Sequence, residues 1–212
     1  MRCFVFFGIQ GSGKGTQADL LGDSLKFQHV SIGDLFREQI SLKTKLGLQV
    51  SEIISRGELV PDELVFDIID QSLHPDRKGI IFDGFPRTLA QAEFLVKHFK
   101  VRQVFFLELS EAKAIARISS RRICRDCGQN YNLVSDPPSE VNVCDACGGK
   151  LIIRNDDKPE AISRRLAEFY EQTLALKDFF AERGLLSEVD AGQEIEAVAK
   201  DIREIVASLP AE

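Results

Sequence analysis

The sequence predicts a three-layer α/β fold in which helices cover both faces of a central parallel sheet. Short apolar segments alternate with segments of helical periodicity, an order typical of parallel sheets. A glycine-rich loop joins the first apolar segment to the first helical one, and a cysteine-bearing segment interrupts the alternation late in the chain. With roughly 150 residues per domain, the 212 residues predict one large domain with insertions.

The first strand is expected at residues 2–7 (RCFVFF), because a short apolar run that ends at a glycine suits a strand buried on both faces. The same pattern predicts further strands at 29–31, 80–82, 104–109 and 185–189. Helical spacing predicts helices from the glycine-rich loop to Leu25, over 34–55 with an interruption near Gly47, after Ser110 as N-cap, over 159–182 and over 193–207.

Composition excludes several classes of protein. Lys and Arg number 27 against 33 Asp and Glu, a net charge of −6 that argues against a general nucleic-acid-binding protein. No apolar run approaches the roughly 18 residues of a membrane span, and the apolar N-terminus meets a glycine-rich segment instead of a signal-peptide cleavage site. We therefore expect a cytoplasmic protein without nucleic-acid or membrane partners, and a monomer because nothing in the sequence requires self-association.

The glycine-rich loop at residues 8–16 (GIQGSGKGT) has the sequence of a phosphate-binding loop. Its glycines allow several backbone N–H groups to face one anion, and the helix that follows adds the positive end of its dipole. Lys14 can then reach the outer phosphates of a nucleotide. An ordinary strand–turn–helix is the structural alternative. The loop therefore predicts a P-loop NTPase-type fold and an ATP site that includes Gly11, Ser12, Gly13, Lys14, Gly15 and Thr16.

The loop departs from the general pattern at Gly15, where a serine or threonine normally binds magnesium and Thr16 comes one residue later. We therefore expect Mg²⁺ to be held largely through water and phosphate oxygens. Asp83, at the end of the expected 80–82 strand, is the acidic partner predicted for this hydrated ion. Its alternative role is that of a turn-forming residue before Gly84.

Four of the five cysteines form two Cys-x-x-Cys pairs, Cys124/Cys127 and Cys144/Cys147, separated by 16 residues within the non-helical segment 123–154. This spacing can close one tetrahedral zinc site, which would be structural because four protein ligands leave no open position. Two disulfides or free thiols are the alternatives. A zinc ribbon that binds nucleic acid is disfavoured, because residues 121–154 contain five Lys or Arg against four Asp or Glu.

Three further motifs lie at residues 31–37 (SIGDLFR), 57–65 (GELVPDELV) and 83–88 (DGFPRT). With the phosphate loop, they resemble the adenylate kinase family over essentially the whole chain, and the cysteine-bearing segment resembles the long zinc-containing lid of bacterial-type members. The resemblance implies Mg²⁺-dependent, reversible phosphoryl transfer between ATP and AMP to give two ADP, in adenine nucleotide homeostasis. It also implies a core of residues 1–30, 60–120 and 158–212, an AMP-binding segment at 31–59 and a lid at 121–157.

The resemblance also assigns roles to individual residues. Beside the loop, it places ATP against Arg117, Arg121 and Gln193, the last through its backbone. It places AMP against Ile32, Arg37, Glu58, Leu59, Val60, Gly84, Phe85, Arg87, Gln91, Arg154 and Arg165. The residues expected to act in catalysis are Lys14, Arg87, Arg121, Arg154 and Arg165.

Elementary chemistry agrees with an arginine-rich site. The phosphate of AMP is already an anionic nucleophile, so the reaction needs positioning and charge neutralisation rather than a general base. Arginine provides both through its planar, permanently charged side chain.

Arg122, Arg164 and Arg183 are expected to be ordinary solvated helix arginines. Asp156 and Asp157 either pair with arginines at the return of the lid or form an acidic cluster before a helix.

Two departures from the family pattern bear on function. Ile9-Gln10 replaces a small residue and a proline that are common in the family loop, and Ile32 replaces a threonine or serine near the AMP base. A kinase with another base preference, using GTP as donor or UMP or CMP as acceptor, is therefore an alternative. The alternative from another class is a zinc-bearing nucleotide sensor without turnover.

We expect the lid and the segment near 31–60 to move, so that closure excludes water.

Overall fold

The computed structural model describes residues 1–74 and 76–210, and the remaining positions of the predicted core, 75 and 211–212, lie outside the described residues. Five parallel strands form the central sheet in the order β2–β3–β1–β4–β8. Their bounds are Arg2–Phe7 for β1, Gln28–Ser31 for β2, Gly79–Asp83 for β3, Lys100–Glu108 for β4 and Leu186–Asp190 for β8. The predicted parallel sheet is confirmed, although β4 begins four residues earlier than expected.

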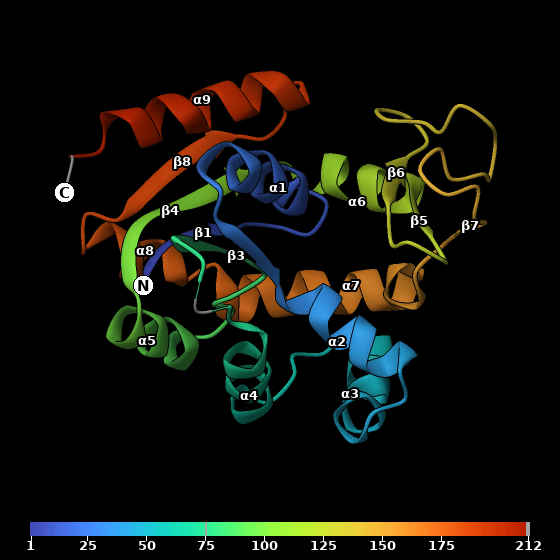
Figure 1. Cartoon of the computed structure of the whole chain (residues 1–212), viewed down its shortest axis with the longest axis horizontal. Helices are drawn as coiled ribbons and strands as arrows, with labels where there is room; N and C mark the ends of the chain where they lie inside the picture. The colour runs from blue at the N-terminus through green and yellow to red at the C-terminus, as the bar shows by residue number, and fades with distance from the viewer. Residues whose placement is uncertain (75, 211–212) are drawn as a thin grey trace.

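Helices cover both faces of this sheet (Figure 1). On one face, α1 and α9 pack against Phe4 and Phe6 of β1. On the other face, α4, α5, α7 and α8 pack against Val5 and Phe7. The helix bounds are Lys14–Leu25 for α1, Ile32–Ser41 for α2, Lys45–Arg56 for α3, Asp62–Ser72 for α4, Leu89–His98 for α5, Glu111–Ser120 for α6, Pro159–Glu168 for α7, Leu176–Ala181 for α8 and Ile195–Ser208 for α9.

Several sequence expectations need correction. Ser110 precedes α6, but its side chain makes no capping hydrogen bond. The expected helix over 159–182 contains a π-helix, η2 (Phe169–Thr173), between α7 and α8. Helices α4 and α5 were not predicted from the sequence pattern.

The non-helical segment contains a small antiparallel sheet in the order β6–β5–β7, followed by a 3₁₀ turn. Their bounds are Arg121–Cys124 for β5, Asn130–Asn132 for β6, Leu151–Ile152 for β7 and Asn155–Asp157 for η1.

The interruption expected near Gly47 is wrong, because the helix breaks at residues 42–44 and Gly47 lies inside α3. Gly47 has a packing role instead. A Cβ atom at this position would lie 2.1 Å from the backbone oxygen of Gln39 in α2. The glycine therefore allows α2 and α3 to approach closely within the predicted AMP-binding segment.

We expect Gly47→Ala to destabilise the protein by about 1–3 kcal/mol, the usual cost of overpacking, and to lower Tm by roughly 3–10 °C for a chain of this size. Thermal unfolding monitored by circular dichroism measures the effect. Gly22→Ala is the matched control, since a Cβ inside α1 would be 3.5 Å from its nearest neighbour. Equal Tm values for Gly47→Ala and the wild type would contradict this account.

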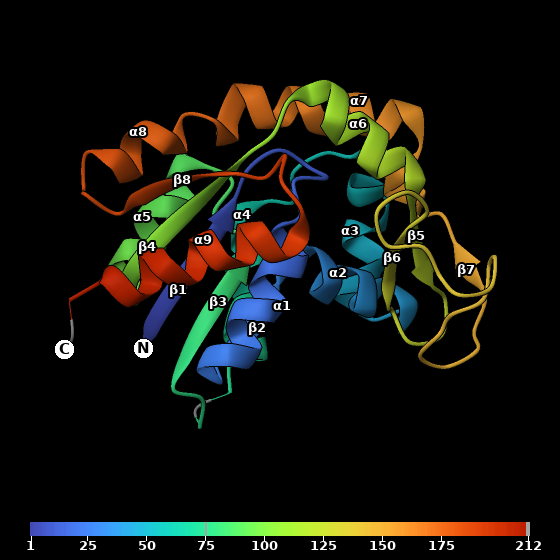
Figure 2. The same cartoon turned by 90° about the horizontal axis from the view of Figure 1, so that it is seen from above.

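The parallel strands bring their carboxyl ends to one edge of the sheet, where the segments after β1, β3 and β8 meet. The small sheet of β5, β6 and β7 lies beyond that edge of the central sheet (Figure 2). In the same view, α2 and α3 lie between the central sheet and the small sheet. Among the described residues, no helix combines the length and apolarity needed to cross a bilayer.

Candidate functional site

One cavity of about 660 Å³ opens at this edge of the sheet. Segments far apart in the sequence line it, including the phosphate loop, the 57–60 segment, the end of β3 and the small sheet. The predicted site residues that line it are Gly11, Ser12, Gly13, Lys14, Gly15, Thr16, Ile32, Arg37, Glu58, Leu59, Val60, Asp83, Gly84, Arg87, Gln91, Arg117, Arg121, Arg154, Arg165 and Gln193. The fold therefore gathers nearly all of them at one place.

Phe85 is the exception among the residues predicted for AMP. Its side chain is fully buried and makes edge contacts with Phe82 and Phe94 in the core, and it does not line the cavity. Its role in the structure is to anchor the turn that presents Gly84 and Arg87. Only its backbone is left for a contact with a ligand.

The phosphate loop joins β1 to α1 as predicted. Gly11 and Gly13 have positive φ values of 81° and 91°, a conformation that glycine adopts without steric cost. Lys14 folds back over the loop, and its Nζ donates to the carbonyl oxygens of Gly8 and Ile9, each at 3.0 Å. Burial lowers the pKa of Lys14 to about 8, although the charge of Asp83 opposes this shift. An anion bound on the loop would favour the charged form and raise this pKa again.

Asp83 ends β3 directly beside the loop. A Cβ atom at Gly15 would lie 3.3 Å from its carboxylate oxygen Oδ2, so the glycine leaves room for a close approach between the carboxylate and the loop. His29 Nε2 lies 4.0 Å from the same oxygen, and His29 Nδ1 is 2.6 Å from Asp19. The carboxylate is thus available at the mouth of the loop, where a hydrated cation can be held.

Asp156 and Asp157 form hydrogen bonds with two arginines of the cavity. Asp157 accepts two hydrogen bonds from Arg121, one of them from Nε at 2.8 Å. Arg165 donates to the backbone oxygen of Asp156 at 2.9 Å and to both carboxylates at 3.2 Å. These contacts confirm the expectation that Asp156 and Asp157 pair with arginines.

Asp34 is a site residue that the sequence interpretation missed. It accepts hydrogen bonds from Arg37 at 2.6 and 3.1 Å, and its carboxylate lies 3.8 Å from Arg154 of the small-sheet segment. Burial opposes ionisation, but these two arginines lower the pKa of Asp34 to about 2. Its place three residues before Arg37 in one helix is a signal that could have identified it.

The arginines carry more positive charge than their partners neutralise. Burial and then the neighbouring arginines lower the pKa of Arg154 to about 10, and burial together with Arg121 and Arg87 lowers that of Arg165 to about 10. The buried Nε of Arg154 has no hydrogen-bond partner. The lowered pKa values of Arg154 and Arg165 and the unpartnered donor of Arg154 both indicate a site that receives anions.

Gln91, one of the residues predicted to contact AMP, is held in place by the protein. Gln91 is buried, its Oε1 accepts from the backbone N–H of Arg87 at 2.8 Å, and its Nε2 donates to Asp62 at 2.6 Å. Each of its two polar atoms keeps one further hydrogen-bonding position. Asp62 is a second residue that sequence reasoning missed, because this contact spans 29 positions.

Glu58 accepts hydrogen bonds from Arg56 at 3.0 Å and from Arg164 at 3.0 Å. Arg164 is an exposed helix arginine, as expected, but its partner is not local, because Glu58 lies 106 positions away in the chain. At the other end of the cavity, the side chain of Gln193 bonds to the backbone of Asp190 and to Asp201, at 3.1 and 2.9 Å. Both bonds occupy the side-chain amide of Gln193, which lines the cavity.

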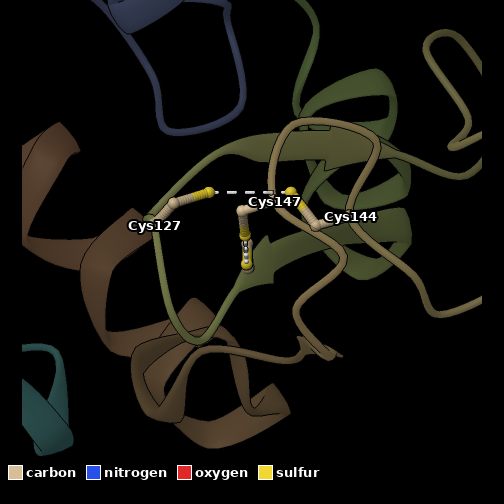
Figure 3. Close-up of side chains that lie close together, drawn as sticks. Cys127, Cys144 and Cys147 are labelled. Atoms are coloured by element: carbon tan, nitrogen blue, oxygen red, sulfur yellow. Dashed lines mark hydrogen bonds between the residues drawn. The ribbon is translucent and has the colours of Figure 1, made fainter.

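The four cysteines of the two Cys-x-x-Cys pairs come together beside the small sheet. Their sulfur atoms all lie within 4.8 Å of one another. The sulfur atoms of Cys124 and Cys147 are 3.5 Å apart. Those of Cys127 and Cys144 are 3.6 Å apart, as the dashed line in Figure 3 marks. A tetrahedral zinc site with bonds of about 2.3 Å has sulfur–sulfur edges of about 3.8 Å. The four sulfurs therefore fit such a site, and their separations are too long for disulfide bonds.

Tyr131 supports this cluster from the cavity side. The backbone N–H of Asp145 donates to the Tyr131 hydroxyl at 2.8 Å, which leaves the hydroxyl hydrogen free to bond Cys144 Sγ at 3.4 Å. This hydrogen bond, together with the backbone N–H groups of Cys147 and Ala146, lowers the pKa of the Cys144 thiol to about 6. The thiolate form, which binds metals, is favoured at this position.

The comparisons with known proteins agree with this geometry. Residues 6–185 match the family model described as Adenylate kinase. The chain belongs to the adenylate kinase family. It is 42% identical to an adenylate kinase of Methanocella arvoryzae over 97% of this chain and 99% of that protein. It is 41% identical to one of Geobacillus sp. strain WCH70, over 97% and 98%, and 42% identical to one of Archaeoglobus fulgidus, over 95% and 96%.

Membership of the adenylate kinase family confirms the predicted resemblance and the predicted enzyme class, an ATP:AMP phosphotransferase. It also favours this activity over the two alternatives, a kinase of other bases and a sensor without turnover. The roles of individual residues remain predictions that rest on where the structure places them.

Proposed function

We propose that the cavity binds Mg·ATP and AMP together and transfers the terminal phosphoryl group of ATP to the AMP phosphate. The observation that carries this proposal is the convergence of Lys14 and six arginines on one cavity. A phosphate oxygen of AMP attacks the terminal phosphorus, the bond from that phosphorus to the bridging oxygen of ATP breaks, and both products are ADP. No proton has to be removed from the nucleophile.

The placement of each group supports a division of roles. Residues 11–16, which include Lys14, hold the ATP phosphates. Arg117 and the backbone of Gln193 contact the ATP base. Arg37 and Arg87 hold the AMP phosphate, while Gln91 and the 58–60 segment, with Ile32, form the AMP side. Arg121, Arg154 and Arg165 neutralise the charge that spreads over the transferring group. Magnesium would neutralise part of the same charge, and Asp83 would hold its water shell.

We propose that Cys124, Cys127, Cys144 and Cys147 hold a structural zinc ion. The fit of the sulfur positions to a tetrahedron supports this, as does the small size of the local core, which is limited to Cys124, Tyr131, Cys144 and Leu151. A unit with so few apolar side chains needs a further source of folding free energy.

We further propose that residues 121–157 act as a lid and residues 31–59 as a mobile AMP-binding segment on a core of the remaining residues. The contacts of Asp34 and Asp156 with arginines of other segments support closure.

Because one chain supplies the complete cavity, we propose a monomer. A reducing, cytoplasmic location would keep the four thiols available for metal.

The test is phosphoryl transfer from Mg·ATP to AMP, UMP, CMP and GMP, with a control without acceptor. We expect turnover with AMP to exceed that with the other acceptors by at least about 100-fold, because a site that hydrogen-bonds one base leaves polar groups unpaired with another. Product formation is followed by separation of the nucleotides.

We expect little ATP hydrolysis in the control without acceptor, because closure excludes water. Faster turnover with another monophosphate would show that Ile32 has changed the base site. Tight ATP binding without transfer to any acceptor would contradict a catalytic role.

A further inference from the structure

The phosphate loop makes one side-chain contact that the proposed roles do not use. Gln10 Nε2 donates to the backbone oxygen of Arg165 at 3.1 Å, across 155 positions of the chain. The family resemblance places Gln10 at a position where proline is common, and proline has no side-chain donor. Its Oε1 is buried without a partner, so the side chain bears the cost of a desolvated polar atom in order to make this bond.

The carbonyl that Gln10 reaches lies close to a change in helix type. The N–H of Phe169 also donates to the Arg165 oxygen, and from Phe169 onward the chain forms the π-helix η2. Two donors therefore fill both acceptor positions of this oxygen. Short π-helical segments inside helices are rare and are often found at functional sites.

Arg165 is consequently held at both ends. Its guanidinium bonds to Asp156 and Asp157 at the return of the proposed lid, and its backbone bonds to the tip of the phosphate loop through Gln10. Phosphoryl transfer is sensitive to the position of the groups that meet the transferring phosphate, and misplacement by about 1 Å can cost roughly 100-fold in rate.

We propose that Gln10 is a positioning residue that fixes the distance between the phosphate loop and the helix that carries Arg165. The inference rests on the role proposed above for Arg165. Gln10 acts through Arg165, so its removal affects the transfer step more than the binding of nucleotides.

The test is a double-mutant cycle between Gln10→Leu, which keeps the approximate size but removes the donor, and Arg165→Ala. We expect Gln10→Leu to lower kcat about tenfold with KM values for ATP and AMP within about twofold of the wild type. In the Arg165→Ala background, assayed at higher enzyme concentration, the same change should alter kcat by less than about twofold. Gln71→Leu is the matched control, because this glutamine is exposed near the end of α4 and does not line the cavity.

Gln10→Pro is the second variant, and we expect it to lose kcat as Gln10→Leu does because it also lacks the donor. Full kcat in Gln10→Pro would show that loop stiffness alone matters and would overturn the inference. Equal losses in both backgrounds would overturn it while leaving the role of Arg165 intact. An unchanged kcat in Arg165→Ala alone would overturn both.

Discussion

Replacement of Lys14 by methionine is expected to lower kcat/KM for ATP by at least about 100- to 1,000-fold, the usual cost of removing one preorganised charge from a transition state. Lys14 is the cation of the phosphate loop, where its Nζ donates to the carbonyl oxygens of Gly8 and Ile9, and it can reach the outer phosphates of a bound ATP. Steady-state kinetics with Mg·ATP and AMP measure the loss. Lys97→Met, on the exposed face of α5, is the matched control.

The stability of the Lys14→Met variant should move in the opposite direction. Burial lowers the pKa of Lys14 to about 8, below its ordinary value of 10.5. The unfolded chain therefore binds the proton more tightly than the folded one, and the charged lysine disfavours folding. This cost is fully present below about pH 8 and disappears as the pH rises to 10.5. Without nucleotide at pH 7, the variant should be at least as stable as the wild type.

The activity and the Tm of Lys14→Met, measured together, distinguish a lost catalytic charge from unfolding of the variant. A loss of activity with an unchanged or higher Tm cannot come from unfolding. Retention of full activity in Lys14→Met would contradict the role of the loop. A Tm well below that of the wild type at pH 7 would contradict the sign of the pKa argument.

The second large effect is expected from removal of the metal site. We expect Cys144→Ser to abolish stoichiometric zinc binding, to lower Tm by roughly 6–12 °C and to lower kcat at least about tenfold. The shift in Tm corresponds to about 3 kcal/mol of lost stability in a chain of this size, a modest fraction of the roughly 10–16 kcal/mol that structural zinc contributes in small zinc-binding peptides. The lid would lose order, and with it Arg121 and Arg154 would lose their fixed positions.

Zinc content by elemental analysis, thermal unfolding and steady-state kinetics are the three measurements for Cys144→Ser. Val141→Ser is the control in the same segment, since this valine is 78% exposed. A strong chelator under reducing conditions should reproduce the effect of the substitution in the wild type. Full activity and an unchanged Tm after chelation, or the detection of two disulfides, would show that the cysteines have another role.

The elements with strong local signals were predictable from the sequence. The phosphate loop is a continuous stretch whose glycines, lysine and position between strand and helix act together. The Cys-x-x-Cys pairs carry their chemistry in their spacing. Strands β1 and β3 are short apolar runs followed by Gly8 and by Asp83-Gly84, a pattern that favours buried strands. By contrast, the break at residues 42–44 was misplaced at Gly47, because a glycine inside a helix does not reveal that a neighbouring helix packs against it.

What the sequence determined by itself is therefore the fold class, the family and the set of charged and sulfur-bearing residues, since these depend on local patterns. The tertiary structure alone decided how those residues are paired. Asp157 bonds Arg121 across 36 positions, and Asp62 bonds Gln91 across 29. Gln10 reaches the backbone of Arg165 across 155. Such contacts depend on the order of strands in the sheet and on the return of distant segments to its edge, and neither leaves a periodic or motif-like signal in the chain.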